Sequence, residues 1–255
     1  TRYWRDWSSD VCSSDLLNNY NNTDIEKCIR NLSKTSLTFE LWFLCDDNKN
    51  GDIRRRNIIL GNYYTGSVGA INLEIDDAGR IKLYVSNGTS KETYLSRELP
   101  NLKDNKWHHL AFTREVIKGV LNKSKVRIFV DGINCIVDNI TNSIEYNPNI
   151  LGSNEVNSLI GSFETPDRTD SNGRRNSYFI GSDARGWPSS KSSHFFQGYL
   201  SNIKIWYTAL NESQVRNSIK STFNKDYFTN ENLLLYIPLK ARSEEHTSEL
   251  QSRQY

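Results

Sequence analysis

A polar stretch early in the chain has oxygen-bearing side chains at a spacing that is typical of calcium-binding loops. Asp46, Asn48 and Asn50 alternate along it, and Gly51 follows where a sharp turn is needed. This order reproduces the first half of the calcium-loop pattern, in which alternate oxygens reach one ion. The twelfth position is Asn57 instead of a bidentate glutamate. The sequence therefore predicts a weak calcium site at Asp46, Asn48 and Asn50, with a polar hairpin as the alternative.

A second polar stretch, GSDARGWPSSKSSHFFQG, has the residue types of a sugar-binding loop. Its candidate ligand-binding residues are Trp187, Asp183, Arg185 and His194. An aromatic ring covers the apolar face of a pyranose, while polar and charged groups beside it bond the hydroxyls. Loops of this kind carry recognition because the strands are committed to packing. The alternative is that Trp187 folds over the rim of the domain as part of its core.

Short strands separated by turns must position these loops. Strands are predicted in residues 37–45, 81–86, 107–113, 125–131 and 203–206. Apolar residues alternate with polar ones in most of these segments, as they do in strands with one buried face. An Asp-Gly pair at residues 131–132 is a typical hairpin turn. The pattern favours an antiparallel β-sandwich.

Aromatic residues inside the predicted strands are assigned structural roles. Trp42, Trp107 and Trp206 are expected to belong to the core, because they lie in strands and not in a polar loop. His108 and His109 are interpreted as hydrogen-bonded histidines within the sheet, because no local motif gives either one the partners of a catalytic base.

One helix is predicted after the last of these strands. Asn211 and Gln214 have the spacing of a capping box at its start, and Leu210 and Val215 occupy the positions of a hydrophobic staple. Val215 and Ile219 then recur at helical spacing. The sequence therefore predicts a short helix with one apolar face.

Four sequence blocks occur in an order that is specific for one fold. They are WHHLAFT (107–113), KVRIFVDG (125–132), YFIGSD (178–183) and FFQGYLSNIKIWYTAL (195–210). With these blocks the chain resembles the laminin-G-like domains of the concanavalin-A-like lectin/glucanase superfamily over most of residues 37–220. The resemblance implies an all-β fold: a two-sheet antiparallel jelly-roll sandwich with one short helix near the C-terminus. This fold hosts sugar binders, protein binders and enzymes, so function needs separate evidence.

Glycoside hydrolases of this superfamily have E-x-D-x-x-E on one strand, which places their carboxyl groups on one face of the sheet. Retaining enzymes hold two carboxyl groups about 5–5.5 Å apart. Here Glu74 and Asp76 are followed by Ala78 and Gly79, so the second glutamate is missing. We therefore interpret Glu74 and Asp76 as strand-end and turn residues and expect no enzyme activity.

The residues and the resemblance together predict a non-catalytic recognition module that binds glycan or a glycosylated surface. Its partners would be carbohydrate or glycoprotein, together with neighbouring domains of a larger chain. The alternatives are a protein–protein or structural adhesion module on the same fold, and a glycoside hydrolase with other catalytic residues. The resemblance also implies an extracellular or cell-surface location.

Charge and composition argue against other classes of partner. The formal net charge is +2, and the only dense basic run is the triplet 54–56, so nucleic acid is not an expected ligand. No apolar run approaches the ~20 residues of a membrane-spanning helix, so membrane insertion is not expected. Cys28, Cys45 and Cys135 lack metal-type spacing and allow at most one disulfide. We expect Cys45 and Cys135 to be buried.

The two ends of the chain resemble translated DNA-sequencing adapter. Residues 242–255 can be back-translated into an adapter string, and the reverse complement of that string encodes residues 3–16. Sequences of this origin are excluded from reasoning about a fold. We therefore expect residues 1–16 and 242–255 not to be native, and residues 17–241 to be a single domain cut from a larger protein.

Overall fold

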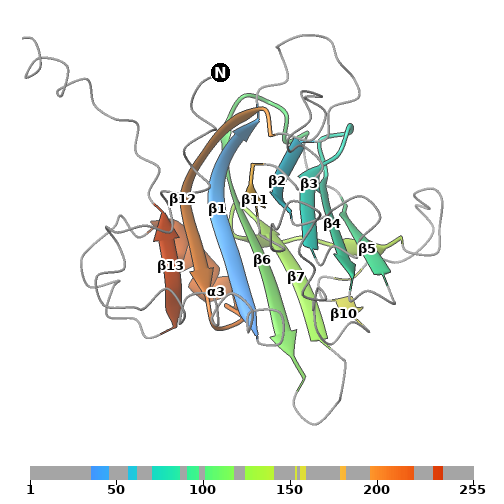
Figure 1. The fold of residues 1–255 in the computed structure, drawn as a ribbon, viewed down its shortest axis with the longest axis vertical. Coiled ribbons are helices and arrows are strands. Elements are labelled where there is room, and N and C mark those ends of the chain that lie inside the picture. The colour runs from blue at the N-terminus through green and yellow to red at the C-terminus, as the bar shows by residue number, and fades with distance from the viewer. Residues whose placement is uncertain are drawn as a thin grey trace, which may run out of the picture.

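The computed structural model describes the following residues: 36–45, 57–61, 71–86, 91–97, 101–117, 124–140, 153, 156–158, 179–181, 196–220 and 232–237. Within these residues the strands form two antiparallel sheets, and one helix lies outside the larger sheet (Figure 1). The predicted all-β sandwich with one short helix is therefore confirmed.

The seven-stranded sheet contains most of the predicted sequence blocks. Its order is β10-β7-β6-β1-β12-β13, with β8 paired to β7. The bounds are β1 (Leu37–Cys45), β6 (Trp107–Val116), β7 (Ser124–Val130), β8 (Ile133–Asn134), β10 (Val156–Ser158), β12 (Gly198–Trp206) and β13 (Leu233–Ile237). Because β1 pairs with β6 on one side and with β12 on the other, it lies inside the sheet and brings together segments distant in sequence.

The six-stranded sheet has the order β11-β2-β3-β4-β5-β9. Its strands are β2 (Asn57–Gly61), β3 (Ile71–Ile75), β4 (Ile81–Ser86), β5 (Lys91–Ser96), β9 (Val137–Asn139) and β11 (Phe179–Ile180). Strands β2 to β5 follow one another as an antiparallel meander, so this sheet is built mainly from local connections.

The core lies between the two sheets and follows the alternation in the sequence. Leu41 and Phe43 point inward from β1, and Ile81, Leu83 and Val85 point inward from β4. All five side chains are fully buried. Burial of one side chain of this size contributes about 1.5–3 kcal/mol relative to its exposure to water. The residues that alternate with them point to the outer face of each sheet, and the surroundings of these residues change along the strand.

Helix α3 (Glu212–Lys220) packs on the outer face of the seven-stranded sheet. The predicted capping box is confirmed: Gln214 N donates to Asn211 Oδ1 at 2.9 Å, and Asn211 N donates to Gln214 Oε1 at 2.8 Å. Leu210 and Val215, the predicted staple residues, are buried in a small apolar cluster between the helix and the sheet. The sequence thus determines both where the helix starts and which face it buries.

Glu40 lies in β1 on the face covered by α3 and is 0% exposed. Its Oε1 accepts hydrogen bonds from Trp206 Nε1 at 3.1 Å and from Ser218 Oγ, and lies 3.2 Å from Lys204 Nζ. Its Oε2 lies 3.5 Å from His109 Nε2. Burial opposes ionisation of Glu40, but the His109 and Lys204 interactions outweigh it and lower its pKa to about 2. A charged carboxylate therefore links β1, β6, β12 and α3.

The Asp-Gly turn predicted at residues 131–132 joins β7 to β8. Both residues have positive φ, 52° at Asp131 and 78° at Gly132, as a two-residue hairpin turn of the primed type requires. A Cβ at Gly132 would lie 2.9 Å from Cγ of Arg216 and 3.1 Å from Cδ1 of Ile219. Arg216 Nε also donates to Gly132 O at 3.0 Å. Glycine therefore serves both the turn and its close contact with α3.

Replacing Glu40 by alanine is expected to lower the free energy of unfolding by about 3–5 kcal/mol, because it removes the negative charge beside a buried ammonium group. The matched control is Glu115→Ala, since Glu115 is half exposed and pairs with Arg127 at the surface. That change is expected to cost less than about 1 kcal/mol. Urea denaturation of both variants measures the difference, and equal losses would contradict the role given to Glu40.

Candidate functional site

The residues predicted to bind calcium or sugar lie outside the described part of the chain. They are Asp46, Asn48 and Asn50 in one loop and Asp183, Arg185, Trp187 and His194 in the other. The structure does describe the residues at which each of these two loops leaves the sandwich and returns to it. Those positions show whether the loops belong to one end of the fold.

The loop that carries Trp187 is closed at its base by backbone hydrogen bonds. Phe196 N donates to Gly181 O at 2.8 Å, so the chain returns directly beside the point where it left. Gly181 N donates to Ile59 O at 2.7 Å, which attaches this base to β2. Phe196 is buried, and its ring lies 6.3 Å from that of Phe43 in an edge-on contact. The base of the loop is thus part of the core.

The predicted calcium loop begins after Cys45 and returns at Asn57, next to the same base. Cys45 is paired with Gly198, and Gln197 N donates to Asn57 Oδ1 at 3.2 Å. A Cβ at Gly198 would lie 1.8 Å from Leu44 O, so this close approach requires glycine. Both loops therefore start at one end of the sandwich, where the arrowhead of β1 lies at the top of Figure 1. We call it the loop end.

At the loop end, the outer face of the seven-stranded sheet carries exposed aromatic side chains. Leu44 is the cross-strand partner of Trp107 on β6 and of Tyr199 on β12. Trp107 is 46% exposed and Tyr199 is 62% exposed. Trp42, two residues before Leu44 on the same face, makes an edge-on contact with His109 at 5.5 Å between ring centroids. We call Tyr199, Leu44 and Trp107 the aromatic row.

The prediction that Trp107 belongs to the core is wrong, whereas Trp206 is buried as predicted. Both residues lie on the outer face, but α3 packs over the part near Glu40 and Trp206. Trp107 is the first residue of β6 and lies beyond this cover. Alternation in the sequence assigns a residue to a face, but it does not indicate how far a helix extends across that face.

His108 points inward from β6 and is held between two carboxylates. Its Nδ1 lies 2.8 Å from Asp131 Oδ2, and its Nε2 lies 3.0 Å from Asp104 Oδ1. Burial lowers the pKa of His108, but the hydrogen bonds and charges of Asp131 and Asp104 outweigh burial and raise it. His109 contacts Glu40 on the other face. The interpretation as a hydrogen-bonded histidine is confirmed for His108. It is wrong for His109, whose Nδ1 is buried without a hydrogen-bond partner among the described residues and whose Nε2 only lies 3.5 Å from Glu40 Oε2.

The two carboxylates considered for catalysis hold local structure. Glu74 Oε2 accepts a hydrogen bond from Asn72 Nδ2 at 3.0 Å, and Glu74 Oε1 lies 3.2 Å from Lys82 Nζ. Asp76 Oδ1 accepts a hydrogen bond from Arg80 N at 2.8 Å, and Asp76 Oδ2 pairs with the Arg80 guanidinium at 2.6 Å. These contacts agree with the interpretation of Glu74 as a strand residue and of Asp76 as a turn residue.

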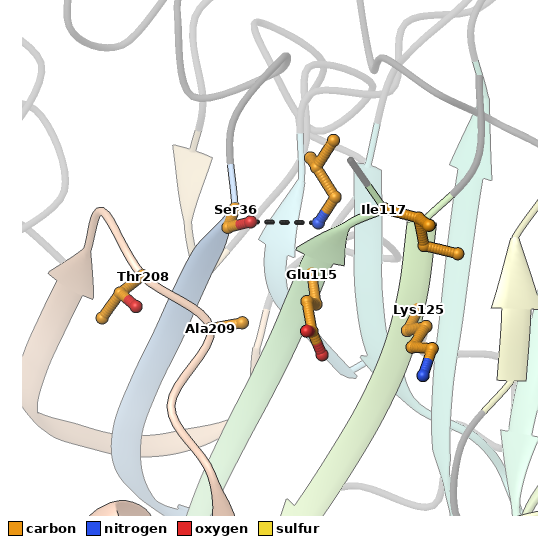
Figure 2. Close-up of a pocket in the computed structure, with 7 residues that line it drawn as sticks. Ser36, Glu115, Ile117, Lys125, Thr208 and Ala209 are labelled. Atoms are coloured by element: carbon orange, nitrogen blue, oxygen red, sulfur yellow. Dashed lines mark hydrogen bonds between the residues drawn. The ribbon is translucent and has the colours of Figure 1, made fainter. Parts of the chain in front are cut away.

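A hollow of about 460 Å³ lies at the opposite end of the sandwich, between the start of β1 and the end of β6 (Figure 2). Its lining residues are Ser36, Glu115, Val116, Ile117, Lys125, Thr208 and Ala209. Ser36 Oγ accepts a hydrogen bond from Val116 N at 3.0 Å, and Glu115 pairs with Arg127 at 3.0 Å. These two polar groups bond within the fold, and we assign no ligand to the hollow.

Within the described ranges, no group of three histidine, cysteine or acidic residues could hold a metal ion. Cys45 and Cys135 are both buried, as predicted. Burial raises the pKa of Cys135 to about 11, so its thiol stays protonated at neutral pH. Cys28 lies outside the described residues. No helix in the described part of the chain is long and apolar enough to cross a membrane.

Two antiparallel sheets enclosing one core, with a helix on one outer face, define a jelly-roll β-sandwich. A laminin G family model described as "Concanavalin A-like lectin/glucanases superfamily" matches residues 17–163, more than half of the chain. The chain belongs to this superfamily. The resemblance inferred from the four sequence blocks is therefore confirmed.

Solved structures with a similar fold come from bacteria and animals. A putative carbohydrate binding protein from Bacteroides ovatus is 20% identical, with a TM-score of 0.48, and the match covers 82% of this chain and 46% of that one. Domains LG4-5 of the mouse laminin alpha1 chain are 18% identical, with a TM-score of 0.43 and coverages of 71% and 37%.

The CBM40 domain of the Ruminococcus gnavus IT-sialidase is 12% identical, with a TM-score of 0.44 and coverages of 75% and 85%. The matches cover less than half the length of the Bacteroides ovatus protein and of the mouse laminin domains. A search of curated proteins finds no match.

The chain is expected to release no sugar from a panel of polysaccharides that includes β-glucan, because Glu74 and Asp76 are held by structural partners. Reducing-sugar release, followed over hours at high protein concentration, measures this. Cleavage that is present in the natural sequence and lost in Glu74→Gln would contradict the expectation.

Proposed function

We propose that this domain is a non-catalytic recognition module that binds glycan, or a glycosylated surface, at its loop end. The observation that carries the proposal is the exposed aromatic row of Tyr199, Leu44 and Trp107. Exposed aromatic side chains gathered on one surface mark binding sites, because water solvates their apolar faces poorly.

The geometry of the row suits an oligosaccharide. Trp107 and Tyr199 flank Leu44 on neighbouring strands, so their backbones are two strand spacings apart, roughly 10 Å. That separation exceeds one sugar ring and allows each aromatic ring to stack on a different unit of a chain. The side chains of the row carry no charge, which favours the C–H faces of neutral sugars. Their indole N–H and phenol O–H groups remain available for hydroxyls.

The two loops rooted at the loop end would supply the remaining contacts. In this proposal Trp187 adds a further stacking surface, and Asp183, Arg185 and His194 bond sugar hydroxyls. Calcium held by Asp46, Asn48 and Asn50 would order the neighbouring loop. Support comes from the bases of both loops, which are bonded to each other through Gln197 and Asn57 and lie beside the aromatic row.

We also propose where the module works. Residues 17–241 would be the native part of the chain and would form one domain of a larger extracellular or cell-surface protein. The support is the complementary adapter-like sequence at the two ends and the family's use of this fold in recognition. Neighbouring domains would then present the loop end to the glycan.

Trp107→Ala and Tyr199→Ala are each expected to weaken glycan binding about ten- to a hundredfold, since one lost stacking aromatic costs about 1–3 kcal/mol. Both residues are substantially exposed, so the melting temperature should change little. Ile133→Ala is the matched control, because Ile133 is 61% exposed but lies outside the row, on β8. Trp187→Ala is expected to act like the row variants.

A glycan array identifies the ligand, and calorimetry of each variant measures its affinity. Binding that is unaffected by both row variants would exclude the aromatic row as the site. A sharp drop in melting temperature without loss of affinity in Trp187→Ala would assign Trp187 to the core. An array without any bound glycan, together with capture of a bare protein partner, would favour the adhesion alternative.

Calcium is expected to bind weakly, with a Kd of about 10⁻⁴–10⁻³ M, because the predicted site has few carboxylates. At ~10 mM calcium such an affinity would stabilise the fold by about 1.4–2.7 kcal/mol. Asp46→Ala should abolish this gain, and Asp77→Ala, which removes an exposed carboxylate from another turn, should retain it. Thermal melting that is identical in calcium and in chelator would remove calcium from the proposal.

A further inference from the structure

Both ring nitrogens of His108 face carboxylate oxygens, and this sets a condition on its protonation. Nδ1 lies 2.8 Å from Asp131 Oδ2 and Nε2 lies 3.0 Å from Asp104 Oδ1. An ionised carboxylate only accepts hydrogen bonds, and a neutral imidazole has only one N–H to donate. The two contacts are therefore both hydrogen bonds only when the ring carries two protons, that is, when His108 is an imidazolium.

The two carboxylates are not held equally firmly. Asp131 is fixed by the backbone: its Oδ1 accepts a hydrogen bond from His109 N at 2.8 Å, and its own N donates to His109 O at 2.8 Å. Among the described residues, the partners of Asp104 other than His108 lie within its own segment: Lys106 N donates to Oδ1 at 3.0 Å, and Lys106 Nζ lies 3.2 Å from Oδ2. When the ring loses a proton, Asp104 is therefore the partner that is released.

The segment that Asp104 belongs to leads directly into the aromatic row. Leu102 anchors its start, because its side chain is in the core and its N donates to Gly79 O at 3.1 Å. Asp104 lies between Leu102 and Trp107, and its contact with His108, four residues later, attaches the segment to β6. Asn105, next to Asp104, has a φ of 60°, a left-handed turn conformation that asparagine tolerates.

We propose that protonation of His108 controls the position of the segment 103–106, and we call this arrangement the latch. When both ring nitrogens carry a proton, His108 holds this segment, which leads into Trp107, against the loop end of the sandwich. Loss of one proton releases the segment. The latch sits on the inner side of β6, opposite the aromatic row, so it acts on the backbone that positions Trp107. It controls the shape of the loop end and is independent of which ligand binds there.

The charged and titratable groups around His108 are few within the described residues. Asp104 faces it from the preceding segment, where Lys106 pairs with Asp104, and Asp131 faces it from the β7–β8 turn. Cys135 lies near Asp131, and burial raises the pKa of its thiol to about 11, so it stays neutral. From β1, the Phe43 ring packs against His108 at 5.7 Å.

The direction of the pH dependence follows from these groups. Burial opposes the charge on His108, but the hydrogen bonds and charges of Asp131 and Asp104 raise its pKa above the ordinary value of 6.5. Burial also opposes ionisation of Asp104, but His108 and Lys106 lower its pKa to about 2, so it remains a carboxylate. The latch is thus fully closed below pH ~6.5 and opens as pH rises through the raised pKa of His108.

The test is an NMR titration of the whole chain from pH 5 to pH 10, following the imidazole signals and the amide signals of residues 103–107. His108→Gln assigns the His108 signal. We expect His108 to titrate above 6.5, and the amides of 103–107 to shift with the same midpoint. Asp104→Asn should move the His108 midpoint down and remove the coupled amide shifts. Glu115→Gln, which changes a half-exposed carboxylate at the opposite end of the sandwich, should leave both unchanged.

The change in stability gives a second readout of the same latch. The unfolding midpoint in urea should be higher for the natural sequence than for Asp104→Asn at pH 6, and this difference should shrink as pH rises. A His108 that titrates at or below its ordinary value would overturn the proposal. It would equally be overturned by amides of 103–107 that do not follow His108, or by a difference from Asp104→Asn that is the same at every pH.

Discussion

The buried carboxylate of Glu40 is the constraint on which the rest of the structure depends. A charge that is removed from water must keep its partners, because losing one of them costs several kcal/mol. Glu40 has partners on β6, β12 and α3, so its contacts hold the helix against this part of the sheet. The helix therefore covers the part of the outer face around Glu40, and the face further along β1 stays open.

Under the proposed function, the covered part of this sheet face contributes to stability and the open part to recognition. Around Glu40 the face is closed by Trp206, Leu210 and Val215 from the end of β12 and from α3. At the loop end the same face presents Tyr199, and both predicted binding loops start beside it. The inner face at this end is held by Phe43, which packs against Phe196, the residue that closes the longer loop. A rigid base under variable loops is the usual arrangement of a recognition site.

Much of the fold could be predicted from the sequence, because local chemistry and tertiary packing agree there. Alternation placed Leu41 and Phe43 in the core, and Asn211 with Gln214 formed the expected capping box. The exposure of Trp107 could not be predicted, because it depends on how far α3 reaches across the sheet. The two carboxylates around His108 could not be predicted either, since they come from a turn and a segment that only the folded chain brings together. The loops with the predicted ligand residues were found from residue types alone, and their site remains a proposal.

We propose that the loop end, with the aromatic row, is the binding surface. Hydrogen–deuterium exchange of the chain with and without a glycan identified on an array tests this most directly, because a bound ligand slows amide exchange where it rests. We expect slower exchange in residues 42–45, 104–108 and 196–201. Slower exchange confined to β3 and β4 in the six-stranded sheet, or to the hollow at the start of β1, would contradict it.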